Sequence, residues 1–281
     1  MAIVTAMIIS IMRIMTTNRG MTTAIAIPTA TVITAIPTPM PQGNRMTTET
    51  LTLNPAGLMR LMTWLSPSFP VGAYTYSHGV EYAVEDGRVS SAESLINWVE
   101  GVLEFGAGRI DAVLFCAAWR AALAGDDDAL FDIGIEADCW RGTSEMALEA
   151  TAQGRAFVST VEKVWGDGML SRWASRMRGD DRLPSYPVAV GIAAAEVKVP
   201  LCDALTAYLH AMAANLVSSA VRLVPLGQTD GVRSLSSLDH AVSIAVDHAM
   251  AAELADLGAS APLIDWTSMK HETQYTRLFR S

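Results

Sequence analysis

The sequence predicts an all-α protein, folded as a single-domain bundle of roughly ten helices. Three observations support this prediction. Apolar residues recur at helical spacing, as at Leu58, Leu61 and Met62. Residues that cap or break helices stand between the apolar stretches. No pair of segments has the alternating pattern of paired strands, and the sequence contains no Asn-Gly hairpin signal.

Caps and prolines predict the first helices. A helix that begins near Leu58 must end before Pro67, because proline lacks the N–H that a helix interior requires. The next helix carries an apolar stripe over residues 95–102, and either Ser90 or Ser91 is a suitable N-cap for it. These signals predict two separate helices before residue 110.

More helices are predicted on either side of Gly125. Residues 110–123 keep helical spacing, and glycine commonly ends a helix in the left-handed conformation. Residues 126–128 are all aspartates, which favour the positive N-terminal end of the next helix. Residues 146–165 are rich in Ala and Glu and predict a further helix.

The longest apolar run covers residues 201–224 and is long enough to cross a membrane. Asp203 and Arg222 interrupt it, and a charge at the centre of a span costs roughly 2.5–3.5 kcal/mol. We therefore expect a helix buried inside the bundle and no association with a membrane. One more helix is predicted over residues 238–257, ended by Gly258.

Residues 1–45 differ from the rest of the chain. They contain no Asp or Glu, and prolines recur between residues 28 and 41. We expect a disordered N-terminal extension or a mis-assigned gene start, since Met46 opens a natural-looking beginning. A transit peptide is the alternative, because such peptides are also poor in acidic residues. The helical domain is expected to span residues 46–281.

Charge and cysteine content narrow the class of protein. The net charge of −9 and the pI near 5.0 disfavour nucleic acid as a partner, because phosphates are repelled. Cys116, Cys139 and Cys202 stand far apart with no C-x-x-C pair. We expect reduced core cysteines in a cytoplasmic protein.

The sequence carries no motif of a known catalytic centre. The phosphate-binding G-x-x-x-x-G-K-[ST] loop and the G-x-S-x-G elbow are both absent, so we expect no enzymatic activity. Glu81 and Glu85 lie one helical turn apart. A pair of buried carboxylates could perform acid–base work, which leaves a helical enzyme as one alternative, but a solvated helix face is the expected arrangement.

Metal binding is also not expected. His240 and His248 are eight residues apart, which on one helix is a rise of about 12 Å, too far to share an ion within one chain. A metal shared by histidines across an oligomer interface remains an alternative.

Two segments have an unusual density of aromatic, glycine and charged residues. The first covers residues 70–81. The second covers residues 271–281, where aromatic and arginine side chains alternate. These residue types are enriched at the energetic centres of protein interfaces. We therefore expect residues 271–281 to be a tail that docks on a partner.

The same segments resemble the urease accessory protein UreF family. Residues 271–281 are similar to the closing signature of that family, residues 219–231 to a second block, and residues 69–81 to a first. The resemblance runs from about residue 57 to the end, with mild departures at Val80 and Val232.

The resemblance implies an all-α homodimer without catalytic activity of its own. It implies a scaffold that bridges a UreD/UreH protein and the GTPase UreG, so that nickel is inserted into apo-urease. An effect on GTP hydrolysis by UreG is a further implication. No cofactor is expected on this chain, because the complex handles the nickel. The alternative is a nickel-binding chaperone that uses interface histidines.

The expected partner-binding residues fall in three segments, namely residues 74–81, a turn over residues 227–233, and the tail. They are Tyr74, Tyr76, Glu81, Gln228, Asp230, Arg233, Tyr275, Arg277, Phe279 and Arg280. For the glycines of these segments, a purely conformational role in turns is the competing explanation.

Overall fold

The computed structural model describes residues 51–280. The described residues all belong to one compact unit. The expectation for residues 1–45 therefore lies outside the described part. Between residues 51 and 280 every regular element is a helix and none is a strand, which confirms the all-α prediction.

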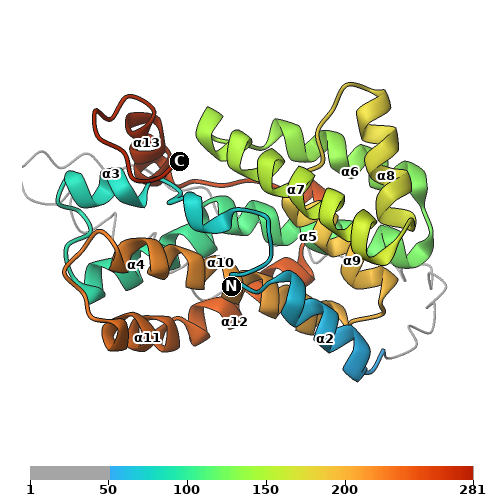
Figure 1. Cartoon of the computed structure of the whole chain (residues 1–281), viewed down its shortest axis with the longest axis horizontal. Coiled ribbons are helices and arrows are strands. Elements are labelled where there is room, and N and C mark those ends of the chain that lie inside the picture. The colour runs from blue at the N-terminus through green and yellow to red at the C-terminus, as the bar shows by residue number, and fades with distance from the viewer. Residues whose placement is uncertain (1–50, 281) are drawn as a thin grey trace, which may run out of the picture. The chain divides into compact units, whose positions relative to one another are not determined.

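Figure 1 shows the helices in chain order. The first half contains α2 (Pro55–Trp64), η1 (Ala73–Thr75), α3 (Val80–Glu85), α4 (Ala92–Phe105), α5 (Ala107–Ala124) and α6 (Asp127–Cys139). The second half contains α7 (Ser144–Trp165), α8 (Met169–Gly179), α9 (Tyr186–Glu196), α10 (Leu201–Val221), α11 (Gln228–Ser237), α12 (Asp239–Ala251), η2 (Leu254–Asp256) and α13 (Pro262–His271).

Helix α5 lies at the centre of the bundle and packs most extensively against α9. Helix α9 is nearly all small apolar residues, and those from Val188 to Ala195 are buried. A Cβ at Gly191 would lie 2.8 Å from the carbonyl oxygen of Phe115, so only glycine permits this approach. Small side chains therefore set the close contact of the two central helices.

The predicted caps are present at several helix ends. Ser91 caps α4, and its hydroxyl accepts a hydrogen bond from the backbone N–H of Ser94 at 3.2 Å. Gly125 ends α5 with a φ of 70°, in the left-handed region. Asp126 caps α6 by accepting from the N–H of Ala129. Local sequence thus determines these boundaries.

Helix α10 is the one helix of the described residues that is long and apolar enough to cross a membrane. Half of its most apolar window is buried within the bundle, where it packs against α4, α5, α9, α11 and α12. These contacts place α10 within the bundle, as its interrupting charges predicted, although only half of its apolar window is buried.

Two predicted boundaries were wrong. The helix expected over residues 238–257 ends at Ala251, because Arg120 donates to the carbonyl oxygens of Met250 and Ala252 and Ala252 is extended. The expected turn at residues 227–233 is mostly the first part of α11. It becomes helical because the Asp230 carboxylate accepts from the N–H of Gly227, which closes the helix start.

The prediction of three core cysteines was wrong for two of them. Cys116 is buried in α5, and burial raises the pKa of its thiol to about 11. Cys139 and Cys202 are exposed, because each lies at a helix end. Apolar neighbours in sequence do not determine which side of a helix end faces solvent.

Candidate partner-docking site at the C-terminal tail

Helix α7 carries a buried polar stripe along one face. Glu145, Glu149 and Gln153 follow one another at four-residue spacing, which places them on the same side of the helix. Thr143 caps the helix and also bonds the hydroxyl of Ser268 in α13 at 2.7 Å. Glu145 lies in the first turn, where the helix dipole favours a carboxylate. The stripe therefore faces α13.

His271, the last residue of α13, is completely buried against this stripe. Its Nδ1 lies 2.9 Å and 3.0 Å from the two carboxylate oxygens of Glu145. Its Nε2 lies 3.0 Å from Oε2 of Glu81, in α3. Both ring nitrogens therefore face a carboxylate. We call this arrangement of Glu81, Glu145 and His271 the carboxylate clamp.

Glu81 reaches the clamp because α3 begins in close contact with α13. Gly79 has a φ of 79°, and a Cβ at this position would lie 2.9 Å from the backbone nitrogen of Ser268. Glycine is required here for both reasons. The expectation that Glu81 lies on a solvated helix face was wrong, because α13 covers it, while Glu85 on the same helix is exposed.

The tail, residues 272–280, is fastened to the clamp through its own backbone. Oε1 of Glu81 accepts from the N–H of Leu278 at 2.6 Å, and Oε2 accepts from the N–H of Phe279 at 2.9 Å. Arg277 adds an ion pair to Oε1 of Glu145 at 3.2 Å. Figure 1 shows the C-terminal end beside α3 and α13. Two buried carboxylates thus hold the tail.

A second anchor lies at the end of the tail. The Phe279 side chain is buried, and the guanidinium of Arg222 lies 4.5 Å from its ring centroid. Arg222 also donates to the carbonyl oxygen of Tyr74 at 3.1 Å. The N–H of Arg280 donates to the carbonyl oxygen of Thr75 at 2.7 Å. The tail therefore packs across η1 and the end of α10.

The clamp changes the acidity of its histidine. Burial alone lowers the pKa of His271, but its hydrogen bonds and charge interactions with Glu145 and Glu81 outweigh burial, so the pKa is raised above 6.5. The pKa of His78 is raised in the same way, since the effect of Glu149 outweighs burial. Both imidazoles are therefore stabilised as cations.

His78 forms a second histidine–carboxylate pair on the α7 stripe. It lies before α3 with a φ of 56°, and its Nδ1 is 3.2 Å from Oε2 of Glu149. Gln153 donates to the other oxygen of Glu149 at 3.0 Å. Glu149 is thus held between His78 and Gln153, and the pair joins the segment before α3 to α7.

A buried ion pair beside this stripe is fully engaged in packing. Arg141 lies 2.6 Å from Asp111, and both side chains are more than nine-tenths buried. Asp111 also accepts from the hydroxyl of Tyr208 at 2.9 Å, and Arg141 donates to that of Ser185 at 2.9 Å. Each charged group has its partners, so the cluster stabilises the fold and leaves no free acid or base.

The expected partner-binding residues divide into two groups. Tyr76, Glu81 and Phe279 are buried, and Asp230 is half-buried. The others are exposed, and they are Tyr74, Gln228, Arg233, Tyr275, Arg277 and Arg280. The buried residues hold the tail and η1 in place, whereas the exposed ones present side chains to solvent.

The structure brings residues 74–81 and the tail together but keeps α11 apart from them. Among the described residues no hydrogen bond or ion pair links α11 to the tail. Gly231 is buried instead against Val221 of α10. The expected residues therefore form two surfaces.

Sequence reasoning missed three residues of the tail anchor, namely Glu145, Arg222 and His271. One signal was present for Glu145, because polar residues at four-residue spacing occur on the same face of α7 as buried apolar ones. For Arg222 and His271 the contacts span long sequence separations, and no local pattern reports them.

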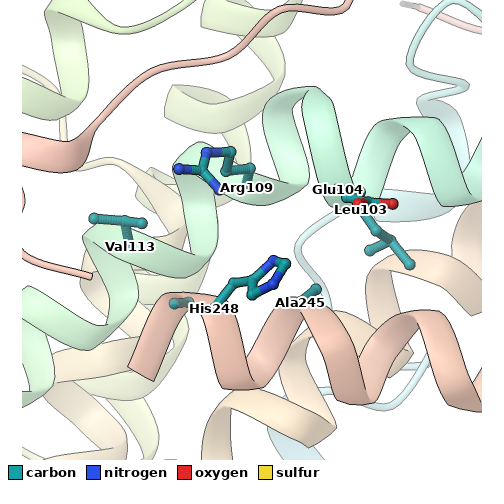
Figure 2. A pocket seen from close by; sticks show the side chains of 7 residues that line it. Leu103, Glu104, Arg109, Val113, Ala245 and His248 are labelled. Carbon is teal, nitrogen blue, oxygen red and sulfur yellow. The ribbon is translucent and has the colours of Figure 1, made fainter. Parts of the chain in front are cut away.

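Two cavities among the described residues differ in size and lining. Figure 2 shows a small pocket lined by the end of α4, the start of α5 and α12, with Arg109 above His248. Its cavity volume is about 10 Å³, at the lower limit for a single water molecule. A larger open cleft of about 400 Å³ contains Glu196, whose carboxylate accepts from the N–H groups of Met169 and Leu170.

Metal ligands do not converge in the described part of the chain. No group of three or more His, Cys, Asp or Glu residues there is arranged to hold an ion. His240 and His248 are exposed on α12, and His271 has both nitrogens engaged.

Comparison with known proteins gives one consistent answer. The family model described as UreF matches residues 89–239. A protein of Granulibacter bethesdensis, named urease accessory protein UreF, is 49% identical over 226 residues, which cover 80% of this chain and 94% of that protein. A protein of Rhodopseudomonas palustris with the same name is also 49% identical, with the same coverage of both chains.

A relative of lower sequence identity carries the same name. A protein of Magnetococcus marinus, again named urease accessory protein UreF, is 45% identical over 230 residues, which cover 80% of this chain and 98% of that protein. These relatives are named as accessory proteins and not as catalysts, and the matched region contains most of the helical bundle. The chain therefore belongs to the UreF family of urease accessory proteins.

Proposed function

We propose that this chain is a scaffold of urease maturation, which docks a UreD/UreH protein through its C-terminal tail and bridges it to the GTPase UreG. The relatives are named urease accessory proteins, which supports a role in maturation. The observation that carries the docking part is the anchoring of the tail backbone to Glu81, with large side chains left exposed.

The exposed side chains of the tail and of η1 are those that an interface would use. Tyr275 is fully exposed, Leu278 is 64% exposed and Tyr74 is 61% exposed. Arg277 and Arg280 lie among them. Tyrosine and arginine are frequent hot-spot residues. Because the clamp already orders the tail, a partner would pay little conformational entropy on binding it.

A scaffold that bridges two proteins needs a second surface, and we assign it to α11. Gln228 and Arg233 are exposed there, and Val232 between them is 70% exposed. We propose that this surface serves UreG or a second copy of the chain, in a homodimer that works in the cytoplasm. Nickel would pass to apo-urease within the complex without a site on this chain.

The test is co-purification of the full chain with its UreD/UreH and UreG partners. The double variant Tyr275→Ala, Leu278→Ala removes exposed side chains and leaves the clamp intact. We expect it to fold normally and to lose the UreD/UreH protein. The matched control is Met59→Ala, Met62→Ala, which removes apolar side chains of α2 that are 69% and 66% exposed. Undiminished docking by the tail variant would refute the proposal.

A nickel-binding chaperone is the second candidate, and one observation favours it. His210, His240 and His248 are all exposed, on α10 and α12, so a second copy of the chain could bring further ligands to them. Equilibrium dialysis of the isolated protein with nickel separates the candidates. Tight stoichiometric binding, lost in the variant His240→Ala, His248→Ala, would favour the chaperone.

A further inference from the structure

We propose that His271 is a proton-dependent latch, which holds the C-terminal tail when its imidazole is doubly protonated and releases the tail when the proton is lost. The latch would regulate the docking surface, so its biological consequence rests on the proposed function. The physical mechanism concerns only the contacts within this chain.

The contacts of the ring favour an imidazole that carries two protons. Nδ1 lies 2.9 Å from Oε2 of Glu145, and Nε2 lies 3.0 Å from Oε2 of Glu81. A neutral imidazole has one N–H, so one of its nitrogens would direct a lone pair at a carboxylate oxygen. Only the imidazolium donates to both carboxylates. His271 also ends α13, where the helix dipole favours a cation.

The charges around the ring balance only with this proton present. The ring faces Glu81 from α3 and Glu145 from α7, and Arg277 from the tail contacts Glu145. With an imidazolium these charges sum to zero, and with a neutral ring they leave one negative charge in a buried cluster. The other nearby ionisable groups, Glu85, Lys270 and Glu272, are exposed to solvent. An uncompensated charge is costly to bury.

The same carboxylate oxygens hold the ring and the tail. Oε2 of Glu81 accepts from both His271 and the N–H of Phe279, and Oε1 of Glu145 accepts from both His271 and Arg277. Release of the tail removes Arg277, but this side chain is already 40% exposed and its charge is screened by solvent. Release also lets water hydrate two carboxylates that are only 7% exposed, and desolvation is the larger effect for buried charges. The fastened state therefore binds a proton more tightly than the released state, and a rise in pH favours release.

The experiment is trypsin cleavage of the full chain after Arg277, between pH 6 and 9, followed by mass spectrometry of the released C-terminal peptide. The Leu278 N–H is bonded to Glu81, so this peptide bond can be cut only when the tail is released. Dividing each rate by that of a matched free peptide, residues 270–281, removes the pH dependence of trypsin.

We expect the protection ratio of the wild-type tail to fall with rising pH, by at most about tenfold per pH unit, since one proton is linked to release. His271→Gln should have low protection at every pH. Glu145→Gln removes one of the two carboxylates, so its fall should begin at lower pH. His78→Gln is the control for the other buried histidine and should keep the wild-type slope.

A wild-type protection ratio that is constant over this pH range overturns the latch, whether or not any variant folds. A wild-type slope that persists in His271→Gln, or disappears in His78→Gln, overturns the assignment to His271. The assay contains no partner protein. Failure of the latch is thus distinct from failure of the docking proposal, which the Tyr275→Ala, Leu278→Ala variant tests.

Discussion

Nε2 of His271 lies 3.0 Å from Oε2 of Glu81, although the two residues are 190 positions apart in the sequence. Through this contact the start of the helical domain and its end meet on the face of α7. The same glutamate accepts two backbone N–H groups of the tail. One buried carboxylate therefore joins α3 both to α13 and to the backbone of the tail.

Removing the charge of Glu81 should destabilise the protein substantially. In Glu81→Gln, one amide oxygen replaces two charged oxygens that accept from Leu278, Phe279 and His271. Breaking a buried, hydrogen-bonded charge pair typically costs about 3–5 kcal/mol. Urea denaturation should show a loss of this order in the free energy of unfolding.

The matched control for that variant is Glu85→Gln, one turn further along α3. Glu85 is exposed, so the change should alter the free energy of unfolding by less than about 0.5 kcal/mol. Equal effects of the two variants would mean that the clamp contributes nothing particular to stability.

Gly79→Ala tests how closely α3 must approach α13. The new methyl group would lie 2.9 Å from the backbone nitrogen of Ser268, on a residue with a φ of 79°. Gly87→Ala is the matched control, since Gly87 has a φ of 76° but no atom within 4 Å of an added Cβ. Both variants carry the backbone strain. We expect Gly79→Ala to be more destabilising by about 1–3 kcal/mol, measured by thermal or urea unfolding.

Sequence reasoning reached the fold class because local signals determine it. The serine before α4 and the glycine after α5 act on neighbouring backbone groups, so their effect can be read in sequence. The early end of α12 could not be read in this way. It depends on Arg120, about 130 residues away, whose guanidinium occupies the carbonyl groups that would have continued the helix.

The docking site was predictable only in outline. Composition identified the tail and residues 70–81 as unusual, and the structure brings these segments together. Spacing predicted that Glu81 faces solvent, because two carboxylates one helical turn apart usually lie on a solvated helix face. The residues of α13 that cover Glu81 follow some 190 positions later in the sequence. No local pattern predicts a contact between residues so far apart in the chain.

The stability of the protein should depend on pH through its two buried histidines. The pKa values of His271 and His78 are both raised above 6.5 in the folded protein. A histidine whose pKa is higher in the folded than in the unfolded protein stabilises the fold. This stabilisation is fully present below the pKa of 6.5 that the histidine has in the unfolded chain. That contribution is lost as the pH rises through the folded value.

The free energy of unfolding should therefore decline as the pH is raised from 6.5, by at most about 1.4 kcal/mol per pH unit for each histidine. Urea denaturation at several pH values measures this decline. It should be weaker in His78→Gln and in His271→Gln than in the wild type, and weakest in the double variant. A wild-type stability that rises over this range would contradict the direction of both shifts.

Arg222 should anchor the end of the tail through its planar guanidinium. It lies 4.5 Å from the ring centroid of Phe279 and donates to the carbonyl oxygen of Tyr74, so it joins the tail to η1. Lysine keeps the positive charge but lacks the planar guanidinium. Only a guanidinium can stack on an aromatic ring and, at the same time, donate an in-plane hydrogen bond to a carbonyl oxygen. In Arg222→Lys the backbone amide of Phe279 should therefore exchange its hydrogen faster, because the free energy that holds the tail in place falls by about 0.5–1 kcal/mol.

Arg233→Lys is the control, because Arg233 is exposed and pairs only with Asp230 of its own helix among the described contacts. If both variants leave the exchange of the Phe279 amide unchanged, retention of the tail depends on the carboxylate clamp alone.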